Sequence, residues 1–200
     1  MLYMKKKHIY KIENMVLREE QTLSFTYFLG LGSNLGTRIQ NLVNALVELR
    51  ASGIAIAVSD VYETEPVGGP QQDYYLNLAC ALETLLEPIE LLHLAKTIEL
   101  NLGRQEGERW GPRLIDIDIL AAGQVQVDVS ELVIPHPRLA ERLFVCRPLA
   151  DLKSDFIPPG MGITVEQMAH QLKDSAKVEL RHSRNELLRR LPEGDWCKTL

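Results

Sequence analysis

The order of segments along the chain predicts an α+β domain with a ferredoxin-like β-α-β-β-α-β core, in which helices pack on an antiparallel sheet. Short apolar runs typical of strands alternate with two amphipathic stretches of helical period between residues 26 and 120. Glycines and prolines separate these runs. The chain of 200 residues is 46% apolar and 24% charged, which is the composition of one globular domain.

The first half of the core supplies three strands and one helix. The apolar run 26–32 ends in glycine and is expected to form a buried strand. Apolar residues recur at helical spacing over 37–50, which predicts an amphipathic helix that ends near Gly53. The segment 54–63 is expected to form the second strand. The alternating segment 75–86 is expected to form the third.

The second half begins with a helix that starts at Pro88 and ends before Gly103, since proline suits the first helical turn and glycine the end of a helix. A fourth strand is expected over 114–120, with 124–129 as its hairpin partner. After residue 137 the periodicity weakens, and only 164–172 indicates another helix.

Three regions are expected: an N-terminal extension over 1–25, the domain over 26–172, and a polar, partly helical tail over 173–200. No run of about 18 apolar residues indicates a transmembrane helix, and the lysines near the N-terminus precede no apolar segment of a secretory signal. The three cysteines are widely spaced, which disfavours a disulfide framework or a zinc cluster. A cytoplasmic monomer is therefore expected.

The charge distribution excludes one class of partner. Residues 25–172 carry ten basic and nineteen acidic side chains, so this domain is a poor electrostatic match for DNA or RNA. Six of the ten basic residues nevertheless fall within one short stretch and indicate a small anionic ligand. They are Arg104, Arg109, Arg113, Arg138, Arg142 and Arg147.

The segment 109–118, Arg-Trp-Gly-Pro-Arg-Leu-Ile-Asp-Ile-Asp, is the strongest candidate for chemistry. Side chains alternate along a strand, so Asp116 and Asp118 project from the same face. Neighbouring carboxylates repel, and Mg²⁺ with substrate phosphates would neutralise them. A solvated edge strand with both aspartates on the surface is the alternative, and the preceding Arg-Trp-Gly-Pro-Arg run disfavours it.

Further candidates lie on both sides of this segment. Arg113 is three residues from Asp116, and its guanidinium suits a phosphate. His136, held between two prolines, is expected to bring a cation near a phosphate, with a structural turn as the alternative. Tyr75 and Asn77 share one strand face and suit a flat heteroaromatic ring, with ordinary strand packing as the alternative.

The run 30–34, Gly-Leu-Gly-Ser-Asn, lacks the remaining residues of a phosphate-binding loop or of a dinucleotide fingerprint. It is interpreted as tight strand-turn-helix geometry.

Together these motifs closely resemble the 6-hydroxymethyl-7,8-dihydropterin pyrophosphokinase family of folate biosynthesis. The most specific motif is Arg-Trp-Gly-Pro-Arg-x-x-Asp-x-Asp at 109–118. The supporting motifs lie, in order, at 31–35, 62–68, 75–77, 99–104 and 135–136. The resemblance covers 26–172 and implies transfer of pyrophosphate from ATP to the pterin hydroxymethyl group, with release of AMP.

The resemblance also implies roles for individual residues. Asp116 and Asp118 match ligands of two Mg²⁺ ions, and Arg104 and Arg113 join them as catalytic residues. The positions matching the ATP site are Glu99, Arg104, Trp110, Arg113, Ile119, His136 and Arg142. The positions matching the pterin site are Thr64, Pro66, Val67, Gly68, Tyr75, Asn77 and Phe144.

The chain departs from the family pattern at Glu106, where many members have a basic residue, and this puts the closure of the neighbouring loop in doubt. Two alternative functions stay open: a Mg²⁺-dependent phosphoryl transferase with another acceptor, and a nucleotide-binding regulator that kept the fold.

Overall fold

The computed structural model describes residues 24–53, 55–66, 70–104, 111–173, 175–194 and 196. Its first elements are β1 (Phe25–Ser33), α1 (Arg38–Ala51), β2 (Ala55–Val58), β3 (Val61–Thr64), β4 (Tyr75–Thr84) and α2 (Pro88–Asn101). Then come β5 (Asp116–Ala122), β6 (Val127–Val129), β7 (Leu132–Ile134) and the short 3₁₀ helix η1 (Leu139–Glu141). The last are α3 (Leu143–Lys153), α4 (Val165–Gln171), β8 (Val178–His182) and α5 (Arg184–Leu188).

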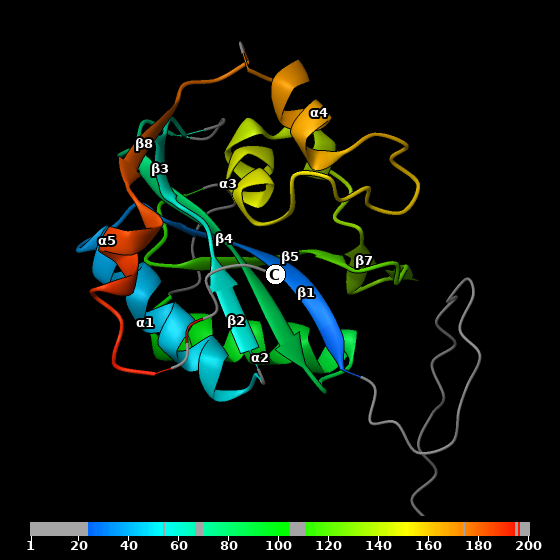
Figure 1. Cartoon of the computed structure of the whole chain (residues 1–200). Coiled ribbons are helices and arrows are strands. Elements are labelled where there is room, and N and C mark those ends of the chain that lie inside the picture. Colours follow the sequence, from blue (N-terminus) through cyan, green and yellow to red (C-terminus); the bar gives the residue numbers. More distant parts are fainter. Residues whose placement is uncertain are drawn as a thin grey trace, which may run out of the picture.

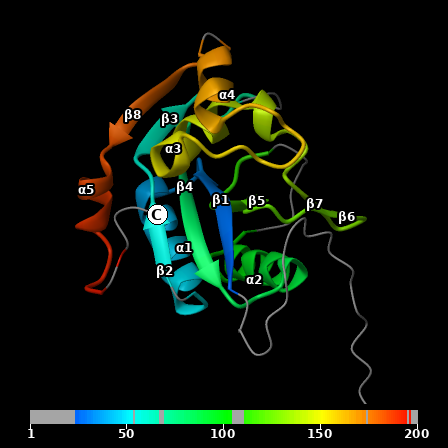
Figure 2. The same ribbon diagram turned by 45° about the vertical axis from the view of Figure 1, so that its right-hand side comes forward.

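The main sheet has the strand order β5-β1-β4-β3-β8, and β2 also pairs with β4 (Figure 1). Each of these pairings is antiparallel. Helices α1 and α2 cover one face of the sheet, and α3 and α4 cover the other, as Figures 1 and 2 show. This confirms the predicted α+β class and the ferredoxin-like core.

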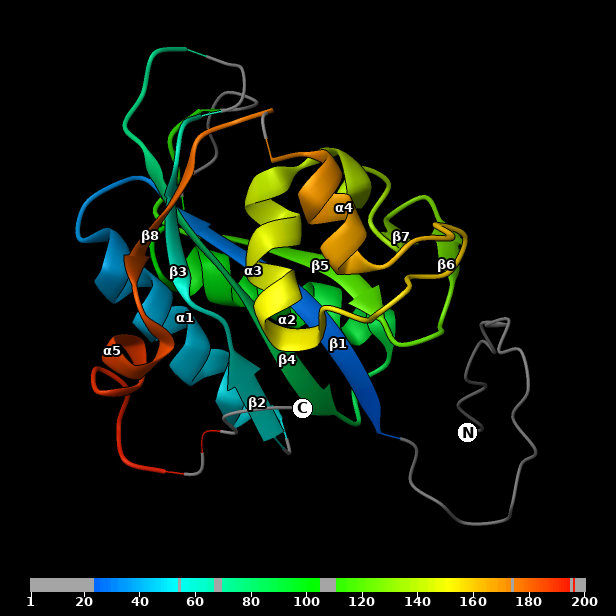
Figure 3. The same ribbon diagram turned by 45° about the horizontal axis from the view of Figure 1, so that its top comes forward.

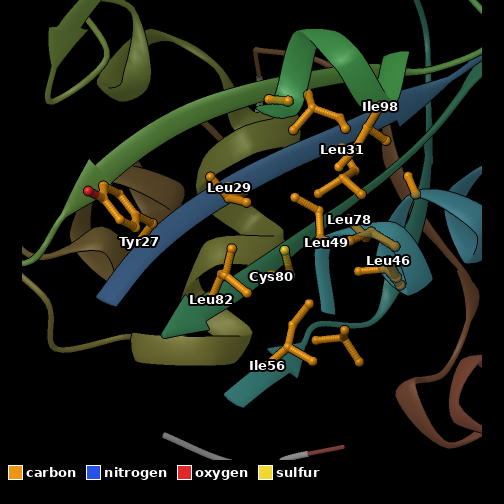
Figure 4. Close-up of a cluster of buried hydrophobic side chains, with 14 of the residues drawn as sticks. Tyr27, Leu29, Leu31, Leu46, Leu49, Ile56, Leu78, Cys80, Leu82 and Ile98 are labelled. Atoms are coloured by element: carbon orange, nitrogen blue, oxygen red, sulfur yellow. The ribbon is translucent and has the colours of Figure 1, made fainter. Parts of the chain in front are cut away.

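Alternation along β1 divides the core into two layers. Tyr27, Leu29 and Leu31 are at most 1% exposed and face α1 and α2, where they meet side chains of β4 and α1 (Figure 4). Phe28 faces α3 and packs on Phe156 with a ring separation of 4.9 Å. The next positions on that second face are glycines, Gly30 and Gly32, so the α3 layer does not extend along the whole strand.

Two predictions for the strands were wrong in detail. The segment 54–63 forms two strands, because Ser59 interrupts the ladder: its N–H donates to Ala79 O at 2.9 Å, and its Oγ accepts from Ala79 N at 2.9 Å. The segment 124–129 is not the hairpin partner of the preceding strand. It supplies β6, which pairs with β7, and only the bridge between Ala122 and Val125 joins it to β5.

The structure adds elements that the periodicity did not predict. Helix α3 contains Pro148, which interrupts the usual pattern of a helix. Strand β8 pairs with β3 at one edge of the main sheet, and Figure 3 shows them side by side. Leu187 and Leu191 are 0% and 8% exposed in the layer that contains α1, so residues after 172 contribute to the core. None of the described helices has the length and apolar character that a bilayer crossing requires.

Candidate active site

A cavity of about 510 Å³ opens on the α3 face of the sheet. Residues of β1, β3, β4, β5, α2 and α3 line it, together with residues of the segments that connect these elements. It brings together many of the side chains that the sequence singled out. These are Thr64, Tyr75, Asn77, Arg104, Arg113, Asp116, Asp118, His136, Arg142 and Phe144.

Two glycines of β1 form part of the cavity lining. A Cβ atom added to Gly32 would lie 2.7 Å from Asn77 Oδ1, and one added to Gly30 would contact Leu120 at 3.4 Å. Among the described glycines with positive φ, Gly36 is the one in this region, at 62°. The interpretation of 30–34 as strand-turn-helix geometry agrees with the structure, in which β1 ends at Ser33 and α1 begins at Arg38. In addition, Gly30 and Gly32 line the cavity.

The Asp116 carboxylate is held by two arginines. Arg104 Nη1 and Arg113 Nη1 each donate to Asp116 Oδ1 at 2.8 Å. All three side chains are partly exposed. Charge-assisted contacts of this kind fix the position of the carboxylate while leaving other guanidinium N–H groups available for an anion.

The Asp118 carboxylate is less well neutralised. It pairs with Arg142, whose Nη1 lies 3.8 Å from Asp118 Oδ2. Burial raises the pKa of Asp118, and the neighbouring charge of Asp116 raises it further. An aspartate in this position gains from an added positive charge, which makes the pair a suitable partial ligand set for a divalent cation.

Glu99 does not line the cavity but contacts residues that belong to the site. Its side chain is 1% exposed. Its Oε1 accepts from Ile117 N at 2.7 Å, and Lys96 Nζ lies 3.1 Å from Oε2. Arg104 also pairs with Glu99. Burial raises the pKa of Glu99, and Lys96 and the Ile117 N–H oppose this shift. Glu99 thereby connects α2 to β5 and positions Arg104.

His136 is a partly buried side chain that accepts a hydrogen bond and lies near two arginines. Its Nδ1 accepts from Arg138 N at 3.1 Å, so the neutral ring carries its proton on Nε2. Burial lowers the pKa of His136, and Arg142 and Arg138 lower it further. Both effects favour the neutral ring, which offers an Nε2–H donor. The expectation that His136 brings a cation near a phosphate stays a prediction.

The opposite part of the cavity carries uncharged polar and aromatic groups. Asn77 Nδ2 donates to Thr64 Oγ1 at 2.7 Å, which leaves Asn77 Oδ1 near the surface of Gly32. Tyr75 belongs to the same strand face as Asn77, and Phe144 enters from the first turn of α3. These groups suit a flat ring with hydrogen-bonding atoms on its edge.

Asn34 joins the two parts of the site and was not predicted from the sequence. It is 1% exposed. Its backbone N–H donates to Arg113 O at 3.0 Å, and its Oδ1 accepts from Arg113 N at 2.7 Å. Its Nδ2 donates to Gln72 Oε1 at 3.0 Å and to Asp73 O at 3.2 Å. A buried asparagine after a strand has no sequence signal that distinguishes this role from a simple turn.

Several predicted site residues do not line the cavity. The Ile119 side chain is 4% exposed and packs in the α1 and α2 layer, so its predicted contact with ATP does not involve the side chain. Pro66 follows Glu65, which does line the cavity. Val67, Gly68 and Trp110, together with Glu106 and Arg109, lie outside the described residues.

The cavity also contains residues that sequence reasoning missed. Lys96 and Gln72 extend its polar lining. Arg138, one of the six clustered arginines that indicated an anionic ligand, also lines it. Lys96 lies one helical turn before Glu99, a spacing that places both on one side of α2 and was available as a signal. Gln72 belongs to the segment between β3 and β4, whose sequence carries no periodicity.

Comparisons with known proteins agree with this geometry. The family model described as 7,8-dihydro-6-hydroxymethylpterin-pyrophosphokinase (HPPK) matches residues 28–154. A 2-amino-4-hydroxy-6-hydroxymethyldihydropteridine pyrophosphokinase of Bacillus subtilis is 44% identical over 127 residues, with 62% of this chain and 76% of that protein covered. A protein of the same name from Methylorubrum extorquens is 45% identical over 135 residues, covering 66% and 85%.

A solved structure supports the fold. The HPPK-DHPS triple mutant of Plasmodium falciparum aligns with a TM-score of 0.62 at 15% sequence identity. The alignment covers 78% of this chain and 46% of that chain, so this protein spans less than half of that one.

Proposed function

The chain belongs to the 7,8-dihydro-6-hydroxymethylpterin-pyrophosphokinase family, and we propose that its cavity transfers pyrophosphate from ATP to 6-hydroxymethyl-7,8-dihydropterin, releasing AMP. One observation carries this proposal: a single cavity joins an arginine-bound aspartate pair to a polar aromatic slot. The first suits a polyphosphate and the second a bicyclic heteroaromatic ring.

The reaction is a displacement at the β-phosphorus of ATP. The hydroxymethyl oxygen of the pterin forms a bond to the β-phosphorus, and the bond from this phosphorus to the α,β-bridging oxygen breaks. The leaving group is AMP, and the hydroxyl proton passes to the medium. Phosphoryl-type transfer of this kind depends mainly on alignment and on stabilisation of charge, so no covalent protein intermediate is required.

Arg104, Arg113 and Arg142 are proposed to bind phosphate oxygens, since their guanidinium groups line the cavity and suit oxyanions. His136 Nε2–H adds a neutral donor. Tyr75 and Phe144 are proposed to hold the pterin ring. Asn77 and Thr64 are proposed to recognise its edge.

The residues present fit Mg²⁺. Asp116 and Asp118 supply two hard oxygen donors on one strand face, and burial and the charge of Asp116 raise the pKa of Asp118 despite its contact with Arg142. We propose that these side chains hold two Mg²⁺ ions together with phosphate oxygens. When bound, the metal would neutralise and orient the triphosphate.

The test is product analysis with the purified full chain, ATP, Mg²⁺ and 6-hydroxymethyl-7,8-dihydropterin. The proposal expects AMP whose formation requires the pterin. Asp118→Asn should abolish it, while Asp128→Asn, on the exposed face of β6, should not. Release of ADP would indicate a phosphoryl transferase instead. Nucleotide binding without turnover would indicate a regulator.

The cytoplasmic location and the monomeric state stay predictions from the sequence. Gel filtration of the purified protein with and without ATP tests the second: elution at the mass of one 22.6 kDa chain is expected.

A further inference from the structure

Arg38, the first residue of α1, lies outside the cavity lining but contacts both ends of the segment that joins β3 to β4. Its Nη2 pairs with Glu63 Oε1 at 2.8 Å, and its Nη1 donates to Tyr74 O at 2.6 Å. Glu63 directly precedes Thr64, and Tyr74 directly precedes Tyr75. One guanidinium therefore touches the neighbours of two proposed pterin-contacting residues.

These contacts lie beside the position where the pairing of β3 with β4 ends at the cavity. Thr64 and Tyr75 are backbone partners at the last position of the β3–β4 ladder. Beyond it, residues 65, 66 and 70–74 lie outside the sheet, and Tyr74 Oη donates to Glu65 Oε1 at 3.0 Å. The contacts of Arg38 with Glu63 and with the Tyr74 carbonyl connect α1 to the same part of the chain.

The helix itself gains nothing from this arginine. Helix α1 has no acidic residue in its first turn, and Thr37 makes no side-chain cap hydrogen bond. A cation at a helix N-terminus opposes the helix dipole. The contacts with Glu63 and Tyr74 therefore account for the position of Arg38. They use two nitrogens of the planar guanidinium group, whereas a lysine side chain has only one nitrogen.

We infer that Arg38 is a positioning residue for the pterin part of the site: it fixes Thr64 and Tyr75 through Glu63 and the Tyr74 carbonyl. This inference rests on the proposed function. It predicts that loss of the guanidinium weakens pterin binding and leaves ATP binding unchanged, because Arg104, Arg113 and Arg142 lie on other segments of the chain.

The test measures KM for each substrate and the dissociation constant of 6-hydroxymethyl-7,8-dihydropterin by calorimetry, in full-length variants. Arg38→Ala should raise the pterin constants about tenfold, as expected for loss of charge-assisted hydrogen bonds, and change KM for ATP less than about twofold. Arg38→Lys should restore part of the loss, since it keeps a charge near Glu63. Glu63→Gln should have a smaller effect than Arg38→Ala, because the Tyr74 contact remains.

Arg50→Ala is the matched control. Arg50 lies at the other end of α1, where its guanidinium stacks 4.7 Å from the Trp196 ring centroid. This variant is expected to lower the melting temperature without changing the ratio of the two KM values.

Three results would overturn the inference: unchanged pterin constants in Arg38→Ala, an equal loss for both substrates, or the same selective loss in Arg50→Ala. If Arg38→Ala does not fold, the ratio of the KM values for pterin and ATP in Arg38→Lys and Glu63→Gln tests the inference instead. If the wild-type protein neither binds nor turns over the pterin, both the proposed function and this inference are wrong. If the wild type is active and Arg38→Ala has normal pterin constants, the inference alone is wrong.

Discussion

Asn34 and Arg113 exchange two hydrogen bonds, from Asn34 N to Arg113 O at 3.0 Å and from Arg113 N to Asn34 Oδ1 at 2.7 Å. The Nδ2 group of the same carboxamide donates to Gln72 Oε1 and to Asp73 O. A single buried side chain thus joins the segment of Arg113, which is proposed to bind phosphate, to the segment that precedes the proposed pterin site. The geometry of the two half-sites is coupled through it.

Asn34→Ala should therefore destabilise the protein and impair turnover together. Removing a fully buried carboxamide leaves the Arg113 N–H and the Asp73 carbonyl without these partners, and we expect a loss of about 2–4 kcal/mol in the free energy of unfolding. Urea denaturation measures it. Asn44→Ala, at an exposed position on α1, should change the same quantity by less than about 0.5 kcal/mol. Equal losses in both variants would contradict the role assigned to Asn34.

The two glycines of β1 should respond differently to a methyl group. Gly32→Ala places a Cβ 2.7 Å from Asn77 Oδ1, so Asn77 must move away from its bond with Thr64, and pterin affinity should fall. Gly30→Ala meets Leu120 at an ordinary contact distance of 3.4 Å and should retain the fold. Calorimetric titration with the pterin checks the difference. Normal pterin affinity in Gly32→Ala would show that Asn77 does not recognise this ligand.

The two aspartates should differ in their effect on stability. Asp118→Asn removes a carboxylate whose pKa is raised by burial and by Asp116, so the metal-free variant should be more stable than the wild type at neutral pH. Because the folded-state pKa lies above the unfolded value of 3.8, the stability that Asp118 contributes at low pH is lost as the pH rises. The advantage of the variant should therefore grow as the pH rises above about 4 and level off once Asp118 is ionised, at less than about 1 kcal/mol given the 38% exposure of the side chain.

Asp116→Asn should have the opposite effect on stability, because it removes the charge that both Arg104 and Arg113 contact at 2.8 Å. Thermal unfolding of the two variants across this pH range separates the roles. Both should lose turnover. An Asp118→Asn variant that is less stable than the wild type at pH 8 would contradict the view that burial and the charge of Asp116 outweigh the contact of this carboxylate with Arg142.

Phe144→Ala should weaken pterin binding and leave ATP binding close to normal. The ring lines the cavity opposite the strand that carries Tyr75, and loss of one stacking partner costs about 1–3 kcal/mol in binding free energy. Phe156→Ala is the matched control, because that ring packs on Phe28 in the α3 layer away from the cavity and should affect stability alone. A parallel loss of affinity for ATP in Phe144→Ala would place the ring elsewhere in the site.

The core of the fold was accessible from the sequence because its strands and helices have regular hydrophobic periods. Asp116 and Asp118 were placed on one face by alternation alone. The break at Ser59 was not, since a serine in an otherwise apolar strand gives no sign that its hydroxyl will replace a ladder bond. The β6–β7 hairpin was missed because a three-residue strand carries too little pattern to choose its partner.

The site was predictable where residue type determines the chemistry, and less so where three-dimensional packing does. Arginines and aspartates in one motif indicated phosphate and metal. The lowered pKa of His136 depends on burial near Arg142, and the proton position on its ring depends on a backbone N–H two residues away; no local pattern reveals either. The space above Gly30 and Gly32 depends on which strands flank β1.

The location of labelled phosphates in the products tests the central claim most directly. The full chain is incubated with Mg²⁺, the pterin and ATP that carries ³²P at either the α or the β position. Transfer of an intact pyrophosphate predicts that the α label appears in AMP and the β label in the pterin product. A β label that remains with the nucleotide as ADP, or the absence of any pterin-dependent change, would contradict the account.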